Sequence, residues 1–204
     1  NDFIENTLNS NIKSDIVIIG GGYTGLNCAL QLSKKFGFDV SVLEAGKTMG
    51  FGSSGRNGGF VCMGPSKLSI NQLIKKYGLK ETQHYYKNQV EGSNFTLQLT
   101  KEYSIDCDIV GNVNFEVSHH PNFINSTKEY SNDLNKYFGL KTKLYSKEEF
   151  ESIGHTGLEQ FGAMSYEPGF ALHPLKFLQG IAKACYNNKV KLFGAIGNDD
   201  NGEI

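Results

Sequence analysis

The sequence predicts an α/β protein in which a parallel βαβ unit is interrupted by a mixed α+β insertion. A β-branched run at 16–19 is followed by glycines and then by apolar residues at helical spacing, which indicates a strand and a helix. A second apolar run at 40–43 completes the βαβ pattern. After a long mixed segment, a helix and a strand pattern over 174–193 is the expected return to the same sheet.

The bulk composition is that of a globular protein. The 204 residues are 39% hydrophobic and 20% charged. Lys and Arg total 20 against 21 acidic residues and form no basic stripe, so we expect no nucleic-acid partner. No apolar run approaches the roughly 20 residues that cross a bilayer, and no signal-peptide pattern is present, so we expect a cytoplasmic protein without a membrane span.

Cysteine and histidine spacing predicts no metal site. His119 and His120 are adjacent at a strand end, so their side chains point to opposite faces. The four cysteines form no C-x-x-C pair, and we expect reduced, mostly buried thiols at Cys28, Cys62, Cys107 and Cys185.

Local patterns define the elements in order. Residues 1–14 are expected to form an arm, and the strand at 16–19 is expected to be buried on both faces. The helix that follows should end at Gly37. A second helical stretch over 68–103 should be interrupted at Gly78.

The insertion combines a strand with short helices. Residues 112–118 alternate Val113, Phe115 and Val117 with polar residues, which indicates a half-buried antiparallel strand. The next helix should run from Pro121 to an αL cap at Gly139. A capping box of Ser146 and Glu149, an extended stretch over 162–171, a helix entered through His173 and Pro174, and a strand at 190–193 follow.

The glycines after the first strand satisfy G-x-G-x-x-G. Gly20 should allow the tight turn, Gly22 should let the backbone approach a pyrophosphate, and Gly25 should let the helix pack on the strand. The helix N-terminus, with Tyr23 and Thr24, favours an anion through its unpaired N–H groups. This turn therefore predicts a dinucleotide site.

Two further features bear on which dinucleotide binds. Glu44 ends the second strand about 20 residues later, where a carboxylate accepts ribose hydroxyls and disfavours NADP. The loop at 50–59 then offers glycines, hydroxyls and a guanidinium, for which a nicotinamide enzyme has no evident use. FAD is favoured, and an NAD-dependent dehydrogenase is the alternative supported by the first motif alone.

Three motifs together resemble the D-amino-acid oxidase superfamily of FAD-dependent oxidoreductases. They are residues 15–25, 43–46 and 54–59, and the segments 104–111 and 172–175 agree with them. The similarity is to the branch that contains γ-glutamylputrescine oxidoreductase and glycine/D-amino-acid oxidases, and it covers only the N-terminal half of such proteins. Phe60, directly after the last motif, is a candidate for lining an amine pocket.

The resemblance implies a function. The expected reaction is oxidation of a C–N bond in an amine or amino acid by hydride transfer to flavin, followed by hydrolysis of the imine, with oxygen or a quinone as electron acceptor. No residue is identified as the catalytic base. The cofactor-binding residues are expected to be Gly20, Gly22, Tyr23, Thr24 and Gly25 for the pyrophosphate, Glu44 and Ala45 for the ribose, and Ser53, Ser54, Arg56, Asn57, Gly58 and Gly59 for the flavin side.

The resemblance also implies a partition of the chain. We expect an N-terminal arm at 1–14, an FAD-binding βαβ unit with its flavin loop at 15–66, a partial substrate domain at 67–168 and a truncated return segment at 169–204. A non-catalytic nucleotide-binding fragment is the remaining alternative.

Overall fold

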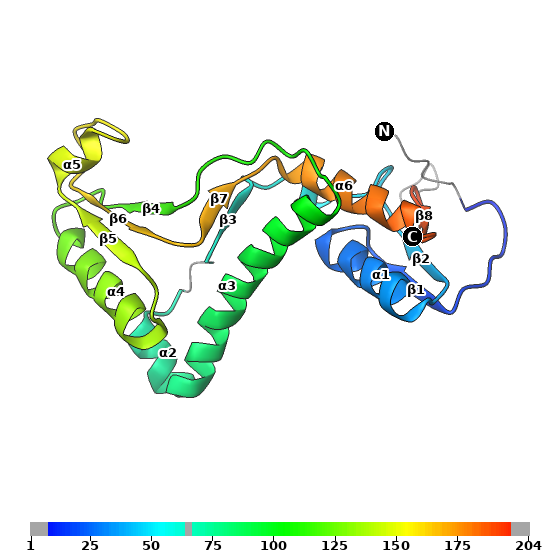
Figure 1. Cartoon of the computed structure of the whole chain (residues 1–204), viewed down its shortest axis with the longest axis horizontal. Helices are drawn as coiled ribbons and strands as arrows, with labels where there is room; N and C mark the ends of the chain where they lie inside the picture. Colours follow the sequence, from blue (N-terminus) through cyan, green and yellow to red (C-terminus); the bar gives the residue numbers. More distant parts are fainter. Residues whose placement is uncertain (1–7, 64–66, 197–204) are drawn as a thin grey trace, which may run out of the picture. The chain divides into compact units, whose positions relative to one another are not determined.

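The computed structural model describes residues 8–63 and 67–196 (Figure 1). Residues 1–7, 64–66 and 197–204 lie outside this description. They belong to the predicted arm, the predicted FAD-binding unit and the predicted return segment. The described chain divides into two compact units, with 8–59, 98–109 and 172–196 in the first and 60–63, 67–97 and 110–171 in the second. Both units mix helices and strands, which confirms the mixed fold class.

The first unit contains a parallel three-stranded sheet. Its strand order is β1 (Ile16–Ile19), β2 (Val40–Leu43) and β8 (Lys191–Phe193). Helix α1 (Tyr23–Phe36) connects β1 to β2, and α6 (Pro174–Asn187) leads into β8. The predicted βαβ unit and its returning helix and strand are therefore present, with β8 parallel to β2.

Helix α1 is fixed by its buried face and by its end. Leu26, Ala29 and Leu30 are fully buried. The helix stops at Gly37, whose φ of 70° lies in the left-handed region that glycine adopts without steric cost. Both features follow the sequence prediction.

The prediction that β1 is buried on both faces is wrong. Val17 is 53% exposed and Ile19 is 88% exposed, whereas Ile16 and Ile18 are half-buried. Ile18 lies against Gly25 of α1, so α1 covers the Ile18 face. Successive side chains of a strand point to opposite faces, and no other described element covers the second face of β1.

The second unit contains two antiparallel sheets. In the larger, β6 (Ala163–Tyr166) lies between β4 (Asn114–Val117) and β5 (Thr142–Tyr145). In the smaller, β3 (Phe60–Cys62) pairs with β7 (Gly169–Ala171). β4 and the extended stretch were predicted, whereas the sequence analysis did not identify β3 and β5.

The helices of the second unit end where the sequence indicates. The predicted break at Gly78 separates α2 from α3, and Gly139 caps α4 with φ of 65°. The capping box of Ser146 and Glu149 opens α5, as predicted. The helix bounds are Ile70–Tyr77 for α2, Leu79–Glu102 for α3, Phe123–Phe138 for α4 and Lys147–Glu151 for α5.

Neither face of β4 is fully buried, since Glu116 and Phe115 are both exposed and Asn114 is half-buried. Glu116 pairs directly with Met164 and Asn114 with Tyr166, so these side chains share one face of the sheet. Phe115, on the other face, remains 39% exposed. The core cluster on the Glu116 side consists of Met63, Ile70, Leu73, Tyr86, Leu134, Met164 and Tyr166. Within residues 8–63 and 67–196, no helix is long and apolar enough to cross a membrane.

Candidate cofactor site

The glycine-rich turn between β1 and α1 depends on two positions that exclude a side chain. Gly20 has φ of +105°, and its N–H donates to the Leu43 carbonyl at 2.7 Å. A Cβ at Gly25 would lie 2.0 Å from the Gly20 carbonyl oxygen and 3.3 Å from Ile18 Cγ2. The turn and the contact of α1 with β1 therefore both require glycine, as the motif predicts.

The N-terminus of α1 is open to an anion. Its N-cap is Gly22, which has no side chain to bond the first N–H groups, and the first turn holds no acidic residue. Ser54 is the neighbour from the following loop, and its Oγ accepts a hydrogen bond from the Tyr23 N–H at 3.3 Å. A serine hydroxyl that accepts one bond can still donate to a phosphate oxygen. The site thus combines helix N–H groups with a hydroxyl donor.

Glu44 connects the glycine turn to the loop after β2. Its Oε2 accepts a hydrogen bond from the Gly21 N–H at 2.8 Å, and its Oε1 accepts one from the Gly46 N–H at 2.8 Å. Each carboxylate oxygen keeps a further lone pair, so the side chain can also accept ribose hydroxyls. Sequence analysis missed Gly21 and Gly46, although their positions beside the motif and two residues after Glu44 were visible.

Asn57 holds the predicted flavin loop in shape. Its Nδ2 donates to the carbonyls of Ser53 at 3.2 Å and Ser54 at 2.9 Å, and its Oδ1 accepts from the Gly59 N–H at 2.9 Å. Gly59 has φ of +74°, and its carbonyl accepts the Leu172 N–H at 2.9 Å. The Asn57 side chain therefore fixes the loop backbone at three points.

Arg56 lies against an aromatic ring at the surface of the predicted flavin loop. Its guanidinium lies 4.4 Å from the centre of the Phe51 ring, and the residue is exposed. Among residues 8–63 and 67–196 no hydrogen-bonding or ion-pair partner contacts the five N–H donors of its guanidinium. Three other residues predicted to bind the cofactor are also exposed, namely Thr24, Ala45 and Gly58.

The comparisons with known proteins fit this geometry. The chain matches the family described as FAD dependent oxidoreductase, abbreviated DAO, over residues 15–195. The chain belongs to this family. The resemblance drawn from the sequence motifs is thereby confirmed, FAD is the cofactor, and the NAD alternative is set aside.

Particular members of the DAO family show how much of a whole protein is present. The chain is 33% identical over 191 residues to the γ-glutamylputrescine oxidoreductase of Escherichia coli K12, covering 92% of this chain and 43% of that protein. Its fold resembles glycine oxidase from Geobacillus kaustophilus, with a TM-score of 0.67 and 19% identity, covering 89% of this chain and 46% of that one. It also resembles L-α-glycerophosphate oxidase from Mycoplasma pneumoniae with FAD bound, with a TM-score of 0.66 and 18% identity. That match covers 91% of this chain and 45% of that one. The chain spans less than half the length of these DAO-family relatives.

Tyr23 of this DAO-family chain contributes to the site through its backbone. Its hydroxyl donates to the Pro174 carbonyl at 3.0 Å, and its ring lies 5.6 Å from the Phe177 ring. Burial of the side chain raises the pKa of Tyr23. The phenol thus attaches α1 to α6, and only the main chain of Tyr23 is left to meet a pyrophosphate.

The histidines serve local structure. His173 is the N-cap of α6, and its Nδ1 accepts the Lys176 N–H at 3.3 Å. His120 Nδ1 accepts the Asn122 N–H at 3.2 Å at the start of α4. Within the described part of the chain, no group of three His, Cys, Asp or Glu residues is placed to hold a metal ion.

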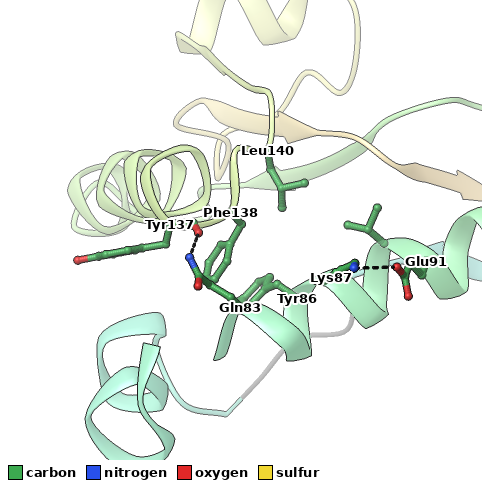
Figure 2. Close-up of a pocket in the computed structure, with 8 residues that line it drawn as sticks. Gln83, Tyr86, Lys87, Glu91, Tyr137, Phe138 and Leu140 are labelled. Atoms are coloured by element: carbon green, nitrogen blue, oxygen red, sulfur yellow. Dashed lines mark hydrogen bonds and ion pairs between the residues drawn. The ribbon is translucent and has the colours of Figure 1, made fainter. Parts of the chain in front are cut away.

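The second unit contains an apolar cavity of about 450 Å³ between α3 and the end of α4 (Figure 2). Tyr86 and Phe138 stack there with ring centres 4.0 Å apart. Gln83 donates to the Tyr137 carbonyl at 2.9 Å, and Lys87 pairs with Glu91 at 3.6 Å. The polar groups of this cavity therefore bond to protein atoms, and Figure 2 shows them at its margin.

Proposed function

We propose that the complete protein is an FAD-dependent oxidoreductase that oxidises a C–N bond of an amine or amino acid. The observation that carries the proposal is the pair of hydrogen bonds by which Glu44 joins Gly21 to Gly46 beside the uncapped α1 N-terminus. Family membership and the names of the relatives, which include a γ-glutamylputrescine oxidoreductase and a glycine oxidase, support the reaction class.

The first unit would hold the adenosine and pyrophosphate parts of FAD. The N–H groups of Gly22, Thr24 and Gly25 begin α1, where the helix dipole favours the phosphates. Glu44, followed by Ala45, would accept the ribose hydroxyls, because its carboxylate is already oriented by two backbone donors.

The loop from Ser53 to Gly59 would bind the inner part of the cofactor. Ser53 and Ser54 would supply hydroxyls, and Arg56 would supply a guanidinium that bonds phosphate or a flavin carbonyl. Asn57 and Gly59 would act by fixing the loop backbone, as their hydrogen bonds indicate. Gly58, with no side chain, allows a flat ring to approach.

The proposed reaction divides the work between cofactor and chain. FAD, when bound, supplies a two-electron acceptor for the hydride that leaves the carbon bearing the nitrogen. The nitrogen loses a proton, a C=N bond forms, and water then hydrolyses the imine. The chain orients the cofactor through the first unit, and we propose that residues 67–168 are part of the substrate domain and 169–204 return to the FAD-binding domain.

Flavin content is the first test of this proposal. The purified protein should show flavin absorbance bands in the near ultraviolet and visible, and acid precipitation should release the colour if FAD is bound without a covalent link. Anaerobic addition of amines, including γ-glutamylated diamines and D-amino acids, should bleach the visible band of the complete protein. Re-oxidation by air or by a quinone then distinguishes the two electron acceptors.

Two results would contradict the proposal. A soluble protein that neither retains nor takes up FAD would favour a non-catalytic chain. A complete flavoprotein that no amine or amino acid reduces would remove the assigned reaction while leaving the cofactor site intact.

A further inference from the structure

The side chain of Tyr23 connects three parts of the first unit. Its hydroxyl donates to the carbonyl of Pro174, the first residue of α6, at 3.0 Å. The same phenol forms a side-chain hydrogen bond with Asn57 of the predicted flavin loop, residues 50–59. Burial raises the pKa of Tyr23 and the bond with Asn57 lowers it, so the Asn57 amide donates to the phenol oxygen. One hydroxyl therefore joins the start of α1, the start of α6 and the flavin loop.

Asn57 extends this connection to the main chain of the flavin loop. Its amide nitrogen donates to the Ser53 carbonyl at 3.2 Å and to the Ser54 carbonyl at 2.9 Å. Its amide oxygen accepts the Gly59 N–H at 2.9 Å. A movement of the Asn57 side chain therefore releases main-chain groups on both sides of it.

The flavin loop is seated closely on the first turns of α6. A Cβ at Gly50 would lie 2.6 Å from Leu178 Cδ2, and a Cβ at Gly59 would lie 3.2 Å from Pro174 Cδ. Contacts of this kind are apolar and give the loop little directional restraint. The hydrogen bonds of the Tyr23 hydroxyl supply that restraint at the same end of α6.

The main chain of Tyr23 belongs to the proposed pyrophosphate site. Its N–H, at the start of α1, donates to Ser54 Oγ at 3.3 Å. The residue thus contacts the flavin loop twice, once through its main chain and once through its side chain. The helix end that would receive the phosphates and the loop that would receive the inner part of FAD are therefore connected by a single residue.

We propose that Tyr23 is a positioning residue for FAD, whose hydroxyl holds the flavin loop on α6 in the cofactor-free protein. The phenol acts through Asn57 and needs no contact with the cofactor. A loop already held in one shape loses less conformational entropy when FAD binds, which raises the affinity. By linkage, bound FAD should also hold the loop more firmly. The inference rests on the proposed function for the identity of the cofactor, whereas the hold on the loop is measurable without it.

Arg56 provides a direct probe, because it is the single arginine of the sequence. An arginine-specific protease therefore cuts the chain only after Arg56, and the cleavage rate follows the population of the open loop. In the FAD-free protein, Tyr23→Phe should speed the cut about three- to tenfold, since a hydrogen-bonding hydroxyl is lost. The phenylalanine ring keeps the contact with Phe177. Tyr186→Phe removes an exposed hydroxyl from α6 and is the matched control, expected to be cut at the parent rate.

A double-mutant cycle separates positioning from a general loss of stability. If the phenol acts through Asn57, Tyr23→Phe should add little to the cleavage rate when Asn57→Ala is already present. A merely structural role would multiply the rate by the same factor in both backgrounds. Circular dichroism and urea unfolding check that each variant is folded. Equal cleavage of Tyr23→Phe and the parent, or equal factors in the two backgrounds, would overturn the proposal.

Addition of FAD distinguishes this inference from the proposed function. Saturating FAD should slow cleavage of the parent, and Tyr23→Phe should bind FAD about three- to tenfold more weakly in a fluorescence titration. Equal FAD affinities, in spite of faster cleavage of Tyr23→Phe, would refute the positioning role. A parent protein that takes up no FAD contradicts the proposed function, and the cleavage rates then decide the hold of Tyr23 on the loop by themselves.

Discussion

Glu44 and Gly21, 23 positions apart, are joined by a hydrogen bond of 2.8 Å from the Gly21 N–H to the Glu44 carboxylate. The other carboxylate oxygen accepts the Gly46 N–H at the same distance. One side chain therefore sets the positions of the glycine turn and of the loop that follows β2. Its orientation is determined before any cofactor arrives, which lowers the entropy cost of binding.

Glu44→Ala should weaken FAD binding by tenfold or more and lower the free energy of unfolding by about 1–3 kcal/mol, because two N–H groups lose their acceptor. Glu44→Gln keeps one acceptor oxygen, so its FAD affinity and its free energy of unfolding should lie between those of the parent and those of Glu44→Ala. FAD titration and urea denaturation measure the two effects. Glu91→Gln, in an exposed pair of α3, should change neither, and an unaltered FAD affinity in Glu44→Ala would remove its assigned role.

Gly25 and Gly92 form a matched pair of helical glycines. A Cβ at Gly25 would lie 2.0 Å from the Gly20 carbonyl oxygen, whereas a Cβ at Gly92 meets nothing within 4 Å. Gly25→Ala should destabilise the protein by about 1–3 kcal/mol through overpacking. Gly92→Ala should stabilise it by about 0.5–1 kcal/mol because alanine favours the helix. Thermal unfolding of both variants checks the opposite signs.

Arg56→Ala should lower FAD affinity with little change in stability. The guanidinium contacts only the Phe51 ring within the described chain, and an exposed contact of this kind contributes about 0.5–1 kcal/mol. Arg56→Lys keeps the charge but loses the planar donors, so it should recover part of the affinity. Fluorescence titration with FAD ranks the three proteins, and identical affinities would show that Arg56 does not meet the cofactor.

Glu116→Gln should make stability less dependent on pH. The folded pKa of Glu116 is raised, so its favourable contribution is complete below its unfolded pKa of about 4.3 and is lost as pH rises through the folded value. The variant should therefore gain stability relative to the parent as pH increases, up to a plateau. Urea unfolding from about pH 4 to about pH 8 measures the difference in free energy of unfolding between Glu116→Gln and the parent. Glu129→Gln, at an exposed position, is the control variant. A constant difference at every pH would contradict the assignment.

The four thiols should react in a defined order with a thiol reagent. Cys28 is exposed, whereas Cys107 and Cys185 are buried. Burial raises the pKa of Cys185 to about 12, and its Sγ donates to the Leu26 carbonyl at 3.2 Å, so little thiolate forms. Mass spectrometry after timed alkylation should show Cys28 modified first and Cys185 last. Cys28→Ser should abolish the fast phase, and early labelling of Cys185 would disprove its burial.

Sequence reasoning succeeded where the determinants are local. The turn from Gly20 to Gly25, the αL caps at Gly37 and Gly139, and the capping box at Ser146 each depend on a few adjacent residues. The resemblance to the DAO family was drawn from short motifs at 15–25, 43–46 and 54–59, and the family model matches residues 15–195. These features were therefore predictable from one sequence.

Sequence reasoning failed where residues far apart in the sequence determine the structure. The pairing of β4 with β6 places Glu116 beside Met164 and leaves Phe115 on the opposite face. The Tyr23 hydroxyl finds its acceptor at Pro174, 151 positions away. Short strands such as β3 have too few residues to show a period.

The position of β8 has a consequence for synthesis of the chain. Ser41 of β2 pairs with Lys191 of β8, its partner 150 positions later. At a ribosomal rate of about 5–20 residues per second, β8 is synthesised roughly 8–30 s after β2. During that interval the outer edge of β2 offers free N–H and C=O groups to any other extended chain. The nascent βαβ unit therefore carries an unpaired strand edge until β8 has been made.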